Sequence, residues 1–487
     1  MDLRKYLKKY YPKKRIRYPH NITMITDYNY DVIPDSVFIA RKGYQCDGYN
    51  FINDAIKRGA KTIIYNSSKS IEKAKGINYI DVKSPLVEQA RLTKMTIENQ
   101  SHKPIFIGVS GSSGKTSVTF LIYSFLKNKQ YDVLLVGTHH LYSYYGTKEE
   151  VTQTENTTPN LSILLKELYN KDYNYDFIVM EVSSQGICEH RILGLEFDII
   201  AITNLCEEHL DYHHTFTEYR MVKGTFLKYL KQDSPYKSII LNIDDDNFEY
   251  FNTLTLEKII SIGIKSGTIQ AYDIELSSTQ TKFKIKDEGK NYQVLSSLIG
   301  EFNVYNILIY YAVLKQLNFK KEEIIDYLKN NITIPGRMNT FYINKRSFIV
   351  DYAHTINAVE SVLSFFINRN DYHNLITVIG AGGDRDKAKR PIFGKLATKY
   401  SDYVIFTTDN PRTEKPQIII EDMICEVETS NFTIVINRAE AIRLAYKISE
   451  ENDIILILGK GNEKSITIDN KKIPYCDLDV VREIINE

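Results

Sequence analysis

The stretch PIFIGVSGSSGKTSVTFLIYSFLKNK, at residues 104–129, constrains the fold more than any other part of the chain. The apolar, β-branched run at 105–109 predicts a strand, glycines and serines then form a loop, and apolar side chains recur at helical spacing after Thr116. Glycine lets the loop backbone approach a ligand, and the first turn of the helix offers unpaired N–H groups to an anion. The pattern therefore predicts a nucleotide triphosphate site.

Two side chains of this loop fit that prediction. Lys115 supplies a positive charge, and the hydroxyl of Thr116 can reach a magnesium ion. The strict phosphate-loop pattern has a glycine where Val109 stands. A plain turn between a strand and a helix is therefore the alternative interpretation.

Composition limits the classes of protein that fit. The length of 487 residues predicts two to four domains, and 62 Lys and Arg against 61 Asp and Glu give no global argument for binding nucleic acid or membrane. Five scattered cysteines indicate reduced thiols rather than disulfides or a zinc site. No apolar run approaches the roughly 20 residues of a membrane span, and the basic start lacks the apolar core of a secretory signal. We expect a soluble, cytoplasmic protein.

Strand-like runs alternate with helical patterns along the chain, which predicts an α/β fold with parallel sheets. The expected strands are 36–40, 61–65, 105–109, 133–136, 177–182, 199–202, 238–243, 347–350, 375–379, 403–407, 432–436 and 453–458. Pro335-Gly336-Arg337 indicates a boundary, and we expect three units at 1–103, 104–335 and 336–487. The polar part near 265–292 suggests a hairpin insert.

The basic start of the chain, MDLRKYLKKYYPKKRIR, has an apolar pattern of its own. Leu3, Tyr6, Leu7 and Tyr10 recur at helical spacing and predict a short surface helix with a solvated basic face. An arm that binds nucleic acid is the less favoured alternative.

Polar side chains follow two of the expected strands of the second unit. Glu181 ends the run at 177–182, so its carboxylate should lie at the carboxyl edge of the sheet, where it could hold magnesium. His209 and His213 are spaced four residues apart, as in zinc proteases. Such a protease needs Glu directly after the first His, and Leu210 stands there, so we discount zinc hydrolysis.

Arginines gather after strands of the third unit. Arg385, Arg390 and Arg412 are expected in loops at the carboxyl ends of strands, where a guanidinium can grip a carboxylate with two hydrogen bonds. A pair of solvated loops is the alternative. The glycine-rich turn at 458–464 is a weak signal alone.

Together these motifs resemble the Mur ligase family, over nearly the whole chain. The ordered motifs are the phosphate loop, NTTP at 156–159, EVSS at 181–184, TNLCEEHLDYH at 203–213 with a following Lys223, GEFNVYN at 300–306, PGR at 335–337, DYAHT at 351–355, GGDRDKAKR at 382–390, DNPR at 409–412 and GKG at 459–461. The resemblance implies three domains: one for the uridine end of the substrate, a central ATPase domain, and a dinucleotide-fold-like domain for an incoming amino acid.

The resemblance also implies roles for particular residues. Catalysis would rest on Lys115, Glu181, His209 and Lys223. ATP contacts would come from Gly111, Ser112, Ser113, Gly114, Lys115, Thr116, Ser117, Asn303, Arg337, Asp351 and His354. Magnesium would be surrounded by Thr116, Glu181, His209 and Lys223, the lysine as a CO2-derived carbamate. The muramoyl peptide would contact Asn156, Thr157, Thr158, Ser183 and Arg191, and the amino acid Arg385, Asp409, Asn410, Arg412, Gly459 and Glu463.

The implied activity is ATP-dependent amide-bond formation in the synthesis of peptidoglycan precursors. The third amino acid, meso-diaminopimelate according to the DNPR form, would be added through an acyl phosphate to UDP-N-acetylmuramoyl-L-Ala-D-Glu. A monomer is expected, without a nucleic acid partner or membrane insertion.

Several positions depart from the family pattern. The family's Asp-Ser-Arg is Asp27-Tyr28-Asn29 here, and Tyr49 replaces the His of Asp-Gly-His. The other departures are Gln185, Glu189, Glu208, Asn339, Ile356-Asn357 and Asn462. They motivate a second hypothesis, a diverged ligase with another carboxylate acceptor. A third hypothesis, a non-catalytic nucleotide-binding scaffold, is disfavoured because Lys115, Glu181, His209 and Lys223 occur together.

Overall fold

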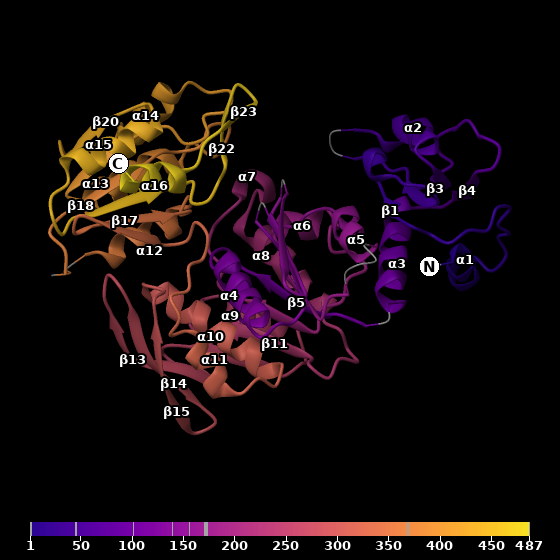
Figure 1. Cartoon of the computed structure of the whole chain (residues 1–487), viewed down its shortest axis with the longest axis horizontal. Helices are drawn as coiled ribbons and strands as arrows, with labels where there is room; N and C mark the ends of the chain where they lie inside the picture. The colour runs from indigo at the N-terminus through magenta and orange to yellow at the C-terminus, as the bar shows by residue number, and fades with distance from the viewer. Residues whose placement is uncertain are drawn as a thin grey trace.

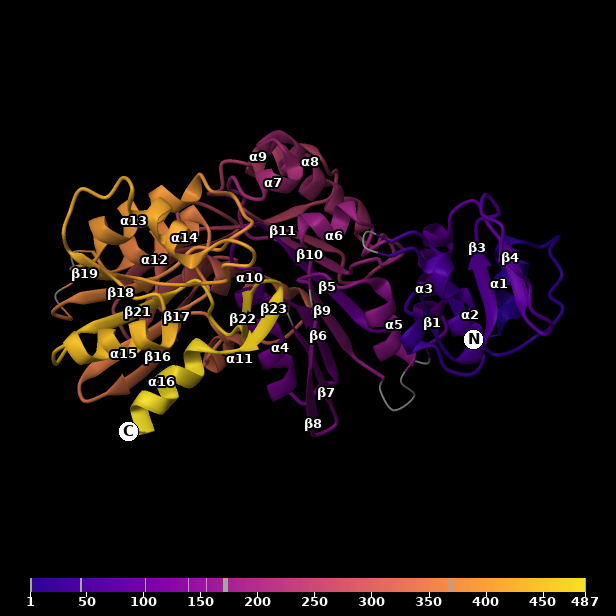
Figure 2. The same ribbon diagram turned by 90° about the horizontal axis from the view of Figure 1, so that it is seen from above.

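Three α/β domains follow one another along the chain in the computed structural model, which describes residues 2–43, 46–100, 102–138, 140–154, 156–169, 174–367, 369 and 371–486. The N-terminal and C-terminal domains lie on opposite sides of the central domain (Figures 1 and 2). Within the described residues, no helix has both the length and the apolar character needed to cross a membrane. The predicted fold class is confirmed.

The N-terminal domain is built on a four-stranded parallel sheet in the order β1-β2-β3-β4. Its elements are α1 (Leu3–Tyr10), β1 (Ile25–Thr26), η1 (Asn29–Asp31), β2 (Ser36–Ile39), η2 (Gly48–Phe51), α2 (Ile52–Lys57), β3 (Ala60–Tyr65), β4 (Asn78–Asp81) and α3 (Pro85–Glu98). All four residues of β2 are buried, as its apolar sequence requires. The predicted surface helix is α1, whose Leu3, Tyr6 and Leu7 are buried.

The central domain is built on an eleven-stranded mixed sheet in the order β15-β14-β13-β12-β11-β10-β5-β9-β6-β7-β8. The strands are β5 (Ile105–Ser110), β6 (Val133–Gly137), β7 (His140–Tyr145), β8 (Lys148–Gln153), β9 (Phe177–Glu181), β10 (Ile199–Ile202), β11 (Ser238–Asn242), β12 (Ile259–Gly263), β13 (Ile269–Leu276), β14 (Thr281–Asp287) and β15 (Lys290–Ser296). The strands from β6 across to β13 pair in parallel. Both edges are antiparallel.

Helices cover both faces of this sheet and create two separate apolar cores. They are α4 (Lys115–Asn128), α5 (Leu161–Tyr169), α6 (Ser184–Cys188), α7 (Leu210–His213), α8 (Phe216–Thr225), η3 (Phe226–Tyr229), α9 (Phe248–Thr253), α10 (Glu301–Gln316) and α11 (Lys321–Tyr327). Helix α10 is buried almost all round, because it packs between α4 and the sheet. The phosphate-loop helix α4 is thereby fixed on one side by the sheet and on the other by α10.

The sheet edges differ from the prediction. The part near 265–292 is larger than a hairpin, since β13, β14 and β15 form three paired strands that widen the central sheet. The β7–β8 hairpin was missed, because all six residues of β8 are exposed and its sequence, KEEVTQ, lacks an apolar run. The parallel character predicted for this unit therefore holds for its centre and not for its edges.

The C-terminal domain has a six-stranded sheet in the order β16-β17-β21-β18-β19-β20, parallel except for β16. Its elements are β16 (Asn339–Ile343), β17 (Arg346–Asp351), α12 (Ile356–Phe365), β18 (Leu375–Ile379), α13 (Lys389–Tyr400), β19 (Tyr403–Phe406), α14 (Pro416–Ile424), β20 (Phe432–Ile434), α15 (Arg438–Ile448), β21 (Ile454–Leu458), β22 (Ser465–Ile468), β23 (Lys471–Pro474) and α16 (Asp477–Asn486). The five predicted strands of this unit are confirmed to within two residues at each end.

A buried ion pair ties the last two helices to this sheet. Arg438 and Asp477 are both fully buried, and the Arg438 guanidinium donates to both carboxylate oxygens at 2.8 Å. The same guanidinium donates to the carbonyl of Leu458 at the end of β21. This contact fixes the start of the GKG turn at 459–461.

We predict that Arg438→Ala destabilises the C-terminal domain by about 3–5 kcal/mol, because the Asp477 charge would stay buried without its partner. Arg443→Ala on the same helix is the matched control: it removes an exposed pair with Glu483 and should cost less than about 1 kcal/mol. Urea unfolding followed by circular dichroism measures both. Equal shifts for the two variants would contradict this account.

Candidate nucleotide-binding and ligase site

The phosphate loop connects β5 to α4 in a conformation that needs two glycines. Gly111 has φ +138° and Gly114 has φ +87°, both in the left-handed region. A Cβ atom on Gly111 would fall 1.9 Å from Thr203 Oγ1, and one on Gly114 would fall 2.4 Å from Asn306 Oδ1. Both glycines therefore allow close packing between the loop and neighbouring elements.

Glu181 lies at the centre of a hydrogen-bonded group beside this loop. It ends β9, the neighbour of β5, and its side chain is buried. Oε2 accepts hydrogen bonds from the hydroxyls of Thr116 and Thr138, each at 3.0 Å, and Oε1 accepts from the Thr138 amide at 2.9 Å. Hydroxyl and carboxylate oxygens of this kind are the ligands that magnesium prefers. The predicted pairing of Thr116 with Glu181 is present.

Lys223 lies on the other side of the loop, on α8, and is 1% exposed. Its Nζ donates to the Gly111 carbonyl at 2.8 Å, and Lys115 Nζ donates to the same oxygen at 2.8 Å. Burial, reinforced by the charge of Lys115, holds the pKa of Lys223 well below its usual range. The sequence alone placed Lys223 in a motif, whereas the structure shows that its amine is buried against the phosphate loop, where its neutral form is favoured.

His209 is less closely associated with this group. It lies in the left-handed region, φ +56°, at the start of α7, and its side chain is 53% exposed. Its Nε2 is 3.7 Å from Glu208 Oε1. Although burial disfavours the charged form, His209 and Lys115 hold the pKa of the Glu208 carboxyl below its ordinary value. Within the described residues no cluster of three or more His, Cys, Asp or Glu side chains could hold a metal ion.

A cavity of about 550 Å³ connects the phosphate loop to the C-terminal domain. Its lining contains every predicted ATP contact except Gly111, together with Thr157, Glu181, His209 and Arg385. Arg337 crosses between the domains, since its guanidinium donates to Thr116 Oγ1 at 3.2 Å. The cavity therefore brings residues more than 200 positions apart in the sequence to one place.

Asp351, which the family resemblance placed among the ATP contacts, binds backbone amides of its own domain in this structure. Its carboxylate accepts hydrogen bonds from the amides of Met338 at 2.8 Å and Ala353 at 2.7 Å. Burial raises the pKa of this carboxyl. Asp351 thus holds the PGR loop against the DYAHT loop in this conformation.

The residues expected to contact the muramoyl peptide surround Thr158. Its hydroxyl donates to the Glu181 carbonyl at 2.9 Å and lies 3.1 Å from Ser183 Oγ. Arg191 donates to the Thr158 carbonyl at 2.8 Å and also forms an ion pair with Glu189. Thr157 lines the cavity, 3.3 Å from Thr138 Oγ1. Asn156 contributes a backbone carbonyl, which accepts from Thr154 at 3.2 Å.

The residues expected to bind the amino acid gather at one end of the C-terminal sheet. Asn410 Nδ2 donates to Glu463 Oε2 at 2.9 Å, and Gly459 lies against Asp409, where a Cβ atom would fall 2.6 Å from Oδ2. Arg412 donates to the Gly383 carbonyl at 2.6 Å. Burial and the nearby charge of Arg385 lower the pKa of Arg412. Two guanidinium groups therefore face one region.

Arg390 is a correction to the sequence prediction. It lies in helix α13 and not in a loop, is fully buried, and forms ion pairs with Glu414 at 2.7 Å and Asp422 at 2.8 Å. A buried arginine that is satisfied by two acids holds α13 against its neighbours and is not available to a substrate. The motif GGDRDKAKR contains one arginine at the cavity, Arg385, and one in the core.

Sequence reasoning missed several residues at the site. Thr138 follows β6 and Asn204 follows β10, so the rule that ligands bind at the carboxyl ends of parallel strands could have found both. Lys460 is fully buried and donates to Asn410 Oδ1 and Glu463 Oε2 at 3.2 and 2.6 Å. Tyr219, on α8, lies 2.9 Å from Ser112 Oγ, and no sequence signal marks it.

A phosphate loop, an acidic group at the adjoining strand end, a buried lysine and a second domain across the cavity define a class of nucleotide-dependent enzyme. Family models match the chain in three consecutive parts: the Mur ligase family catalytic domain at residues 22–102, the Mur ligase middle domain at 109–314 and the Mur ligase glutamate ligase domain at 336–461. The chain belongs to the Mur ligase family.

Relatives of similar length agree with this assignment. The chain is 33% identical over 93% of its length to a UDP-N-acetylmuramoyl-L-alanyl-D-glutamate–2,6-diaminopimelate ligase from Caldanaerobacter subterraneus, of which 92% is covered. It is 34% identical over 96% of its length to UDP-N-acetylmuramyl-tripeptide synthetase 2 from Oceanobacillus iheyensis, of which 95% is covered.

Solved structures share the fold over the whole chain. A UDP-N-acetylmuramoyl-L-alanyl-D-glutamate–2,6-diaminopimelate ligase matches with a TM-score of 0.68 and 26% identity, covering 99% of this chain and 98% of that one. MurF ligase from Thermotoga maritima, in complex with ADP, matches with a TM-score of 0.68 at 18% identity, covering 89% and 93%.

We predict that Gly111→Ala weakens ATP binding at least about tenfold, because the left-handed backbone costs about 1–2 kcal/mol and the added methyl overlaps Thr203. Isothermal titration calorimetry with ATP measures this. Gly146→Ala is the control, since Gly146 also has a positive φ but an added Cβ would meet nothing within 4 Å. Unchanged ATP affinity in Gly111→Ala would contradict the assigned loop geometry.

Proposed function

We propose that this chain is an ATP-dependent ligase that adds meso-diaminopimelate to the D-glutamyl carboxylate of UDP-N-acetylmuramoyl-L-Ala-D-Glu, in peptidoglycan precursor synthesis. The observation that best supports this function is the cavity, in which the phosphate loop and Glu181 face arginines of the C-terminal domain. The names of the full-length relatives support the same substrates. We propose that the uridine end of the substrate binds to residues 1–103, ATP to residues 104–335 and the amino acid to residues 336–487.

ATP, the phosphate donor, would bind at the phosphate loop. The loop amides and Lys115 would hold the phosphates of ATP, with Asn303, Arg337 and His354 at the far side of the cavity. In this conformation Lys115 Nζ donates to its own loop carbonyls, Gly111 and Ser112. Those contacts fix the ammonium at the loop, where it would meet the phosphates.

The residues around Glu181 fit a magnesium ion. Thr116 and Glu181 offer hard oxygen donors 3.0 Å apart on the cavity wall. Magnesium bound there would neutralise charge on the phosphates during transfer. His209, half-exposed on the wall of the same cavity, would complete this site.

We further propose that Lys223 carries a carbamate. Only a neutral amine attacks CO2, and burial lowers the pKa of Lys223 toward that form. The neutral amine nitrogen bonds to the carbon of CO2 and loses one proton, which converts a neutral group beside the phosphate loop into an anion. An anion at this place can approach a magnesium ion that an ammonium would repel.

The proposed positions of the ligands lead to the following reaction. The D-glutamyl carboxylate, held near Thr157, Thr158 and Arg191, attacks the γ-phosphorus of ATP, ADP leaves, and an acyl phosphate forms. The amine of the amino acid, held by the C-terminal domain, attacks the acyl carbon, and inorganic phosphate leaves with formation of the amide. The protein contributes mainly positioning and neutralisation of charge. Both ligands must meet, so we expect domain movement near residues 103 and 335.

Arg385 and Arg412 favour diaminopimelate as the amino acid. Lysine has the same reacting amine but lacks the carboxylate at the far end of diaminopimelate. A guanidinium pair left without that carboxylate would disfavour lysine strongly. We also propose that the protein is a monomer in the cytoplasm, where ATP is available.

A second candidate is a related ligase with a different acceptor. In the N-terminal domain, Asp27 pairs with Arg41 at 2.6 Å, and Tyr28 accepts a hydrogen bond from Asn160. Tyr49 OH donates to the Asn66 carbonyl at 3.1 Å. Tyr28 and Tyr49 depart from the family pattern, and their contacts favour a different arrangement at the uridine end.

One assay tests the proposal directly. Phosphate release from ATP and magnesium is measured with the muramoyl dipeptide and a panel of amino acids. Turnover that requires both the dipeptide and diaminopimelate is expected. Turnover with another acceptor only would favour the second candidate, and ATP binding without any turnover would refute a ligase.

We predict that Lys223→Ala abolishes turnover, at least about 1,000-fold, while ATP still binds, and that added bicarbonate does not restore activity. The variant loses the carbamate and not the phosphate loop. Lys228→Ala, one turn beyond α8 in η3, is the control and should remain active. Full activity in Lys223→Ala would refute the carbamate role.

We predict that Arg412→Ala raises the KM for diaminopimelate about 10- to 100-fold and changes the KM for ATP little, because hydrogen bonds to a charged group contribute about 1.5–3 kcal/mol. Residual turnover with lysine should be unaffected, because lysine lacks the far carboxylate. Arg443→Ala serves as the surface control. Equal rises in both KM values would show that the amino-acid pocket is misplaced.

A further inference from the structure

The positive charge of this chain is concentrated in the N-terminal domain. The whole chain has 62 Lys and Arg against 61 Asp and Glu, but residues 1–103 have 20 against 10, which leaves 42 against 51 for the rest. Residues 2–18 alone hold eight basic side chains and one acid, Asp2. The N-terminal part of the chain is therefore strongly basic, although the charges of the whole chain nearly cancel.

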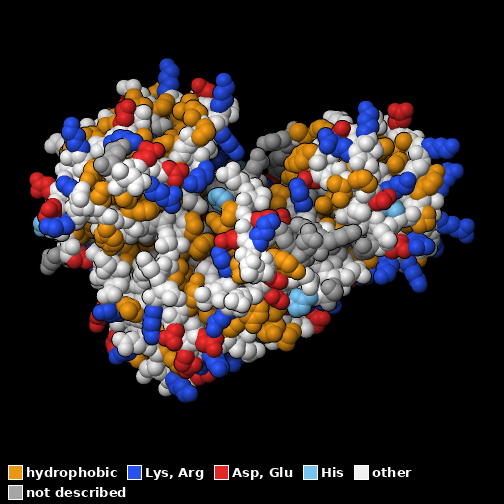
Figure 3. Space-filling model, in the orientation of Figure 1, with side chains coloured by type: hydrophobic (Ala, Val, Ile, Leu, Met, Phe, Trp, Pro, Cys, Tyr) orange, Lys and Arg blue, Asp and Glu red, His pale blue; other side chains and the backbone are white. Residues whose placement is uncertain are grey.

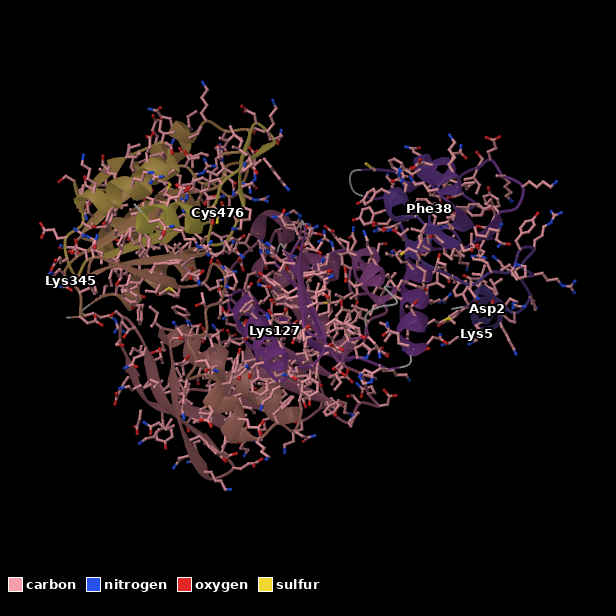
Figure 4. All side chains as sticks on the ribbon, viewed as in Figure 1. Asp2, Lys5, Phe38, Lys127, Lys345 and Cys476 are labelled. Atoms are coloured by element: carbon pink, nitrogen blue, oxygen red, sulfur yellow. The ribbon has the colours of Figure 1, made fainter. Side chains whose placement is uncertain are left out.

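Eight exposed basic side chains of α1 and of the loop that follows it make up a charged region, which we name the basic face. It consists of Arg4, Lys5, Lys8, Lys9, Lys13, Lys14, Arg15 and Arg17, all exposed. Asp2 and Lys5 lie in the N-terminal domain, far from the C-terminal domain (Figure 4), and Lys and Arg side chains project from the outer side of the N-terminal domain (Figure 3). The basic face thus lies away from the nucleotide cavity.

The charge of the basic face is largely uncompensated. Arg4 pairs with Asp2 at 2.8 Å and Lys9 with Glu98 at 3.1 Å. Within the described part of the chain, the other six basic residues form no ion pair. The nearby acid Glu88 does not neutralise them, because it accepts hydrogen bonds from Tyr6 and Tyr11 and pairs with Arg91.

The contacts of the basic face favour an anionic surface over a nucleic acid. The inner side of α1, with Leu3, Tyr6 and Leu7, is buried in the domain, so the face cannot enter a groove as a separate helix. The tyrosine rings are already covered, Tyr11 by Lys14 at 4.8 Å and Tyr10 by Arg91 at 4.9 Å. They are therefore not free to stack on bases, which is how single strands are bound.

We propose that the basic face attaches this protein to an anionic membrane surface. Clusters of about four to eight Lys and Arg are sufficient for electrostatic attraction to anionic lipids. Because the apolar side of α1 is already buried, attachment uses charge alone, without insertion, and salt reverses it. The C-terminal domain, at the other end of the molecule, stays free to move against the central domain (Figure 1).

The test is co-sedimentation of the full-length protein with vesicles. Phosphatidylcholine vesicles with about one-third phosphatidylglycerol are compared with phosphatidylcholine alone. The variant Lys5→Gln/Lys8→Gln/Lys13→Gln/Arg15→Gln removes four unpaired charges. The control Lys399→Gln/Lys447→Gln/Lys471→Gln/Lys472→Gln removes four exposed charges from the C-terminal domain.

Wild type and control should bind the anionic vesicles only, and about 0.5 M salt should release them. The basic-face variant should partition about 100-fold more weakly, with unchanged thermal unfolding and unchanged ligase turnover on soluble substrates. Three results would overturn the proposal: no binding by wild type at low salt, equal loss in the control, or tighter binding to duplex RNA than to the anionic vesicles. The last result would assign the basic face to nucleic acid.

Discussion

Two lysines converge on one backbone carbonyl beside the phosphate loop, and the proposed chemistry of the site depends on this contact. Lys115 and Lys223 both donate to the Gly111 oxygen at 2.8 Å, and Lys223 has no access to water. Two ammonium groups so close together are unfavourable, and the buried one gives up its proton more easily. The proposed carbamate gives a reason for a buried lysine beside the phosphate loop.

The sheet topology places the other components around that contact. The carboxyl ends of the adjacent parallel strands β5, β9 and β10 carry Ser110, Glu181 and Asn204, in that order. One edge of the sheet therefore holds a hydroxyl, a carboxylate and an amide. The C-terminal domain reaches this edge through Arg337, which donates to Thr116. Residues of two domains therefore line the cavity, whereas the basic face belongs to the N-terminal domain alone.

Buried strands and the phosphate loop could be predicted from the sequence because both have strong local signals. The runs at 105–109 and 375–379 are apolar and β-branched, and they became fully paired strands. Exposed edge elements such as β8 have no such signal. Arg390 shows the limit for the site: its sequence context matched that of Arg385, but the acids Glu414 and Asp422, which determine its burial, lie 24 and 32 positions away. Partners this distant are visible only in the fold.

The proposed carbamate requires that the buried amine of Lys223 reach its neutral form and bind CO2. Nuclear magnetic resonance of the protein equilibrated with isotopically labelled bicarbonate observes a lysine carbamate directly. The account predicts one protein-bound carbamate resonance that is absent from Lys223→Ala and diminishes as acid protonates the amine. No resonance in the wild-type protein, or one that persists in Lys223→Ala, would contradict the account.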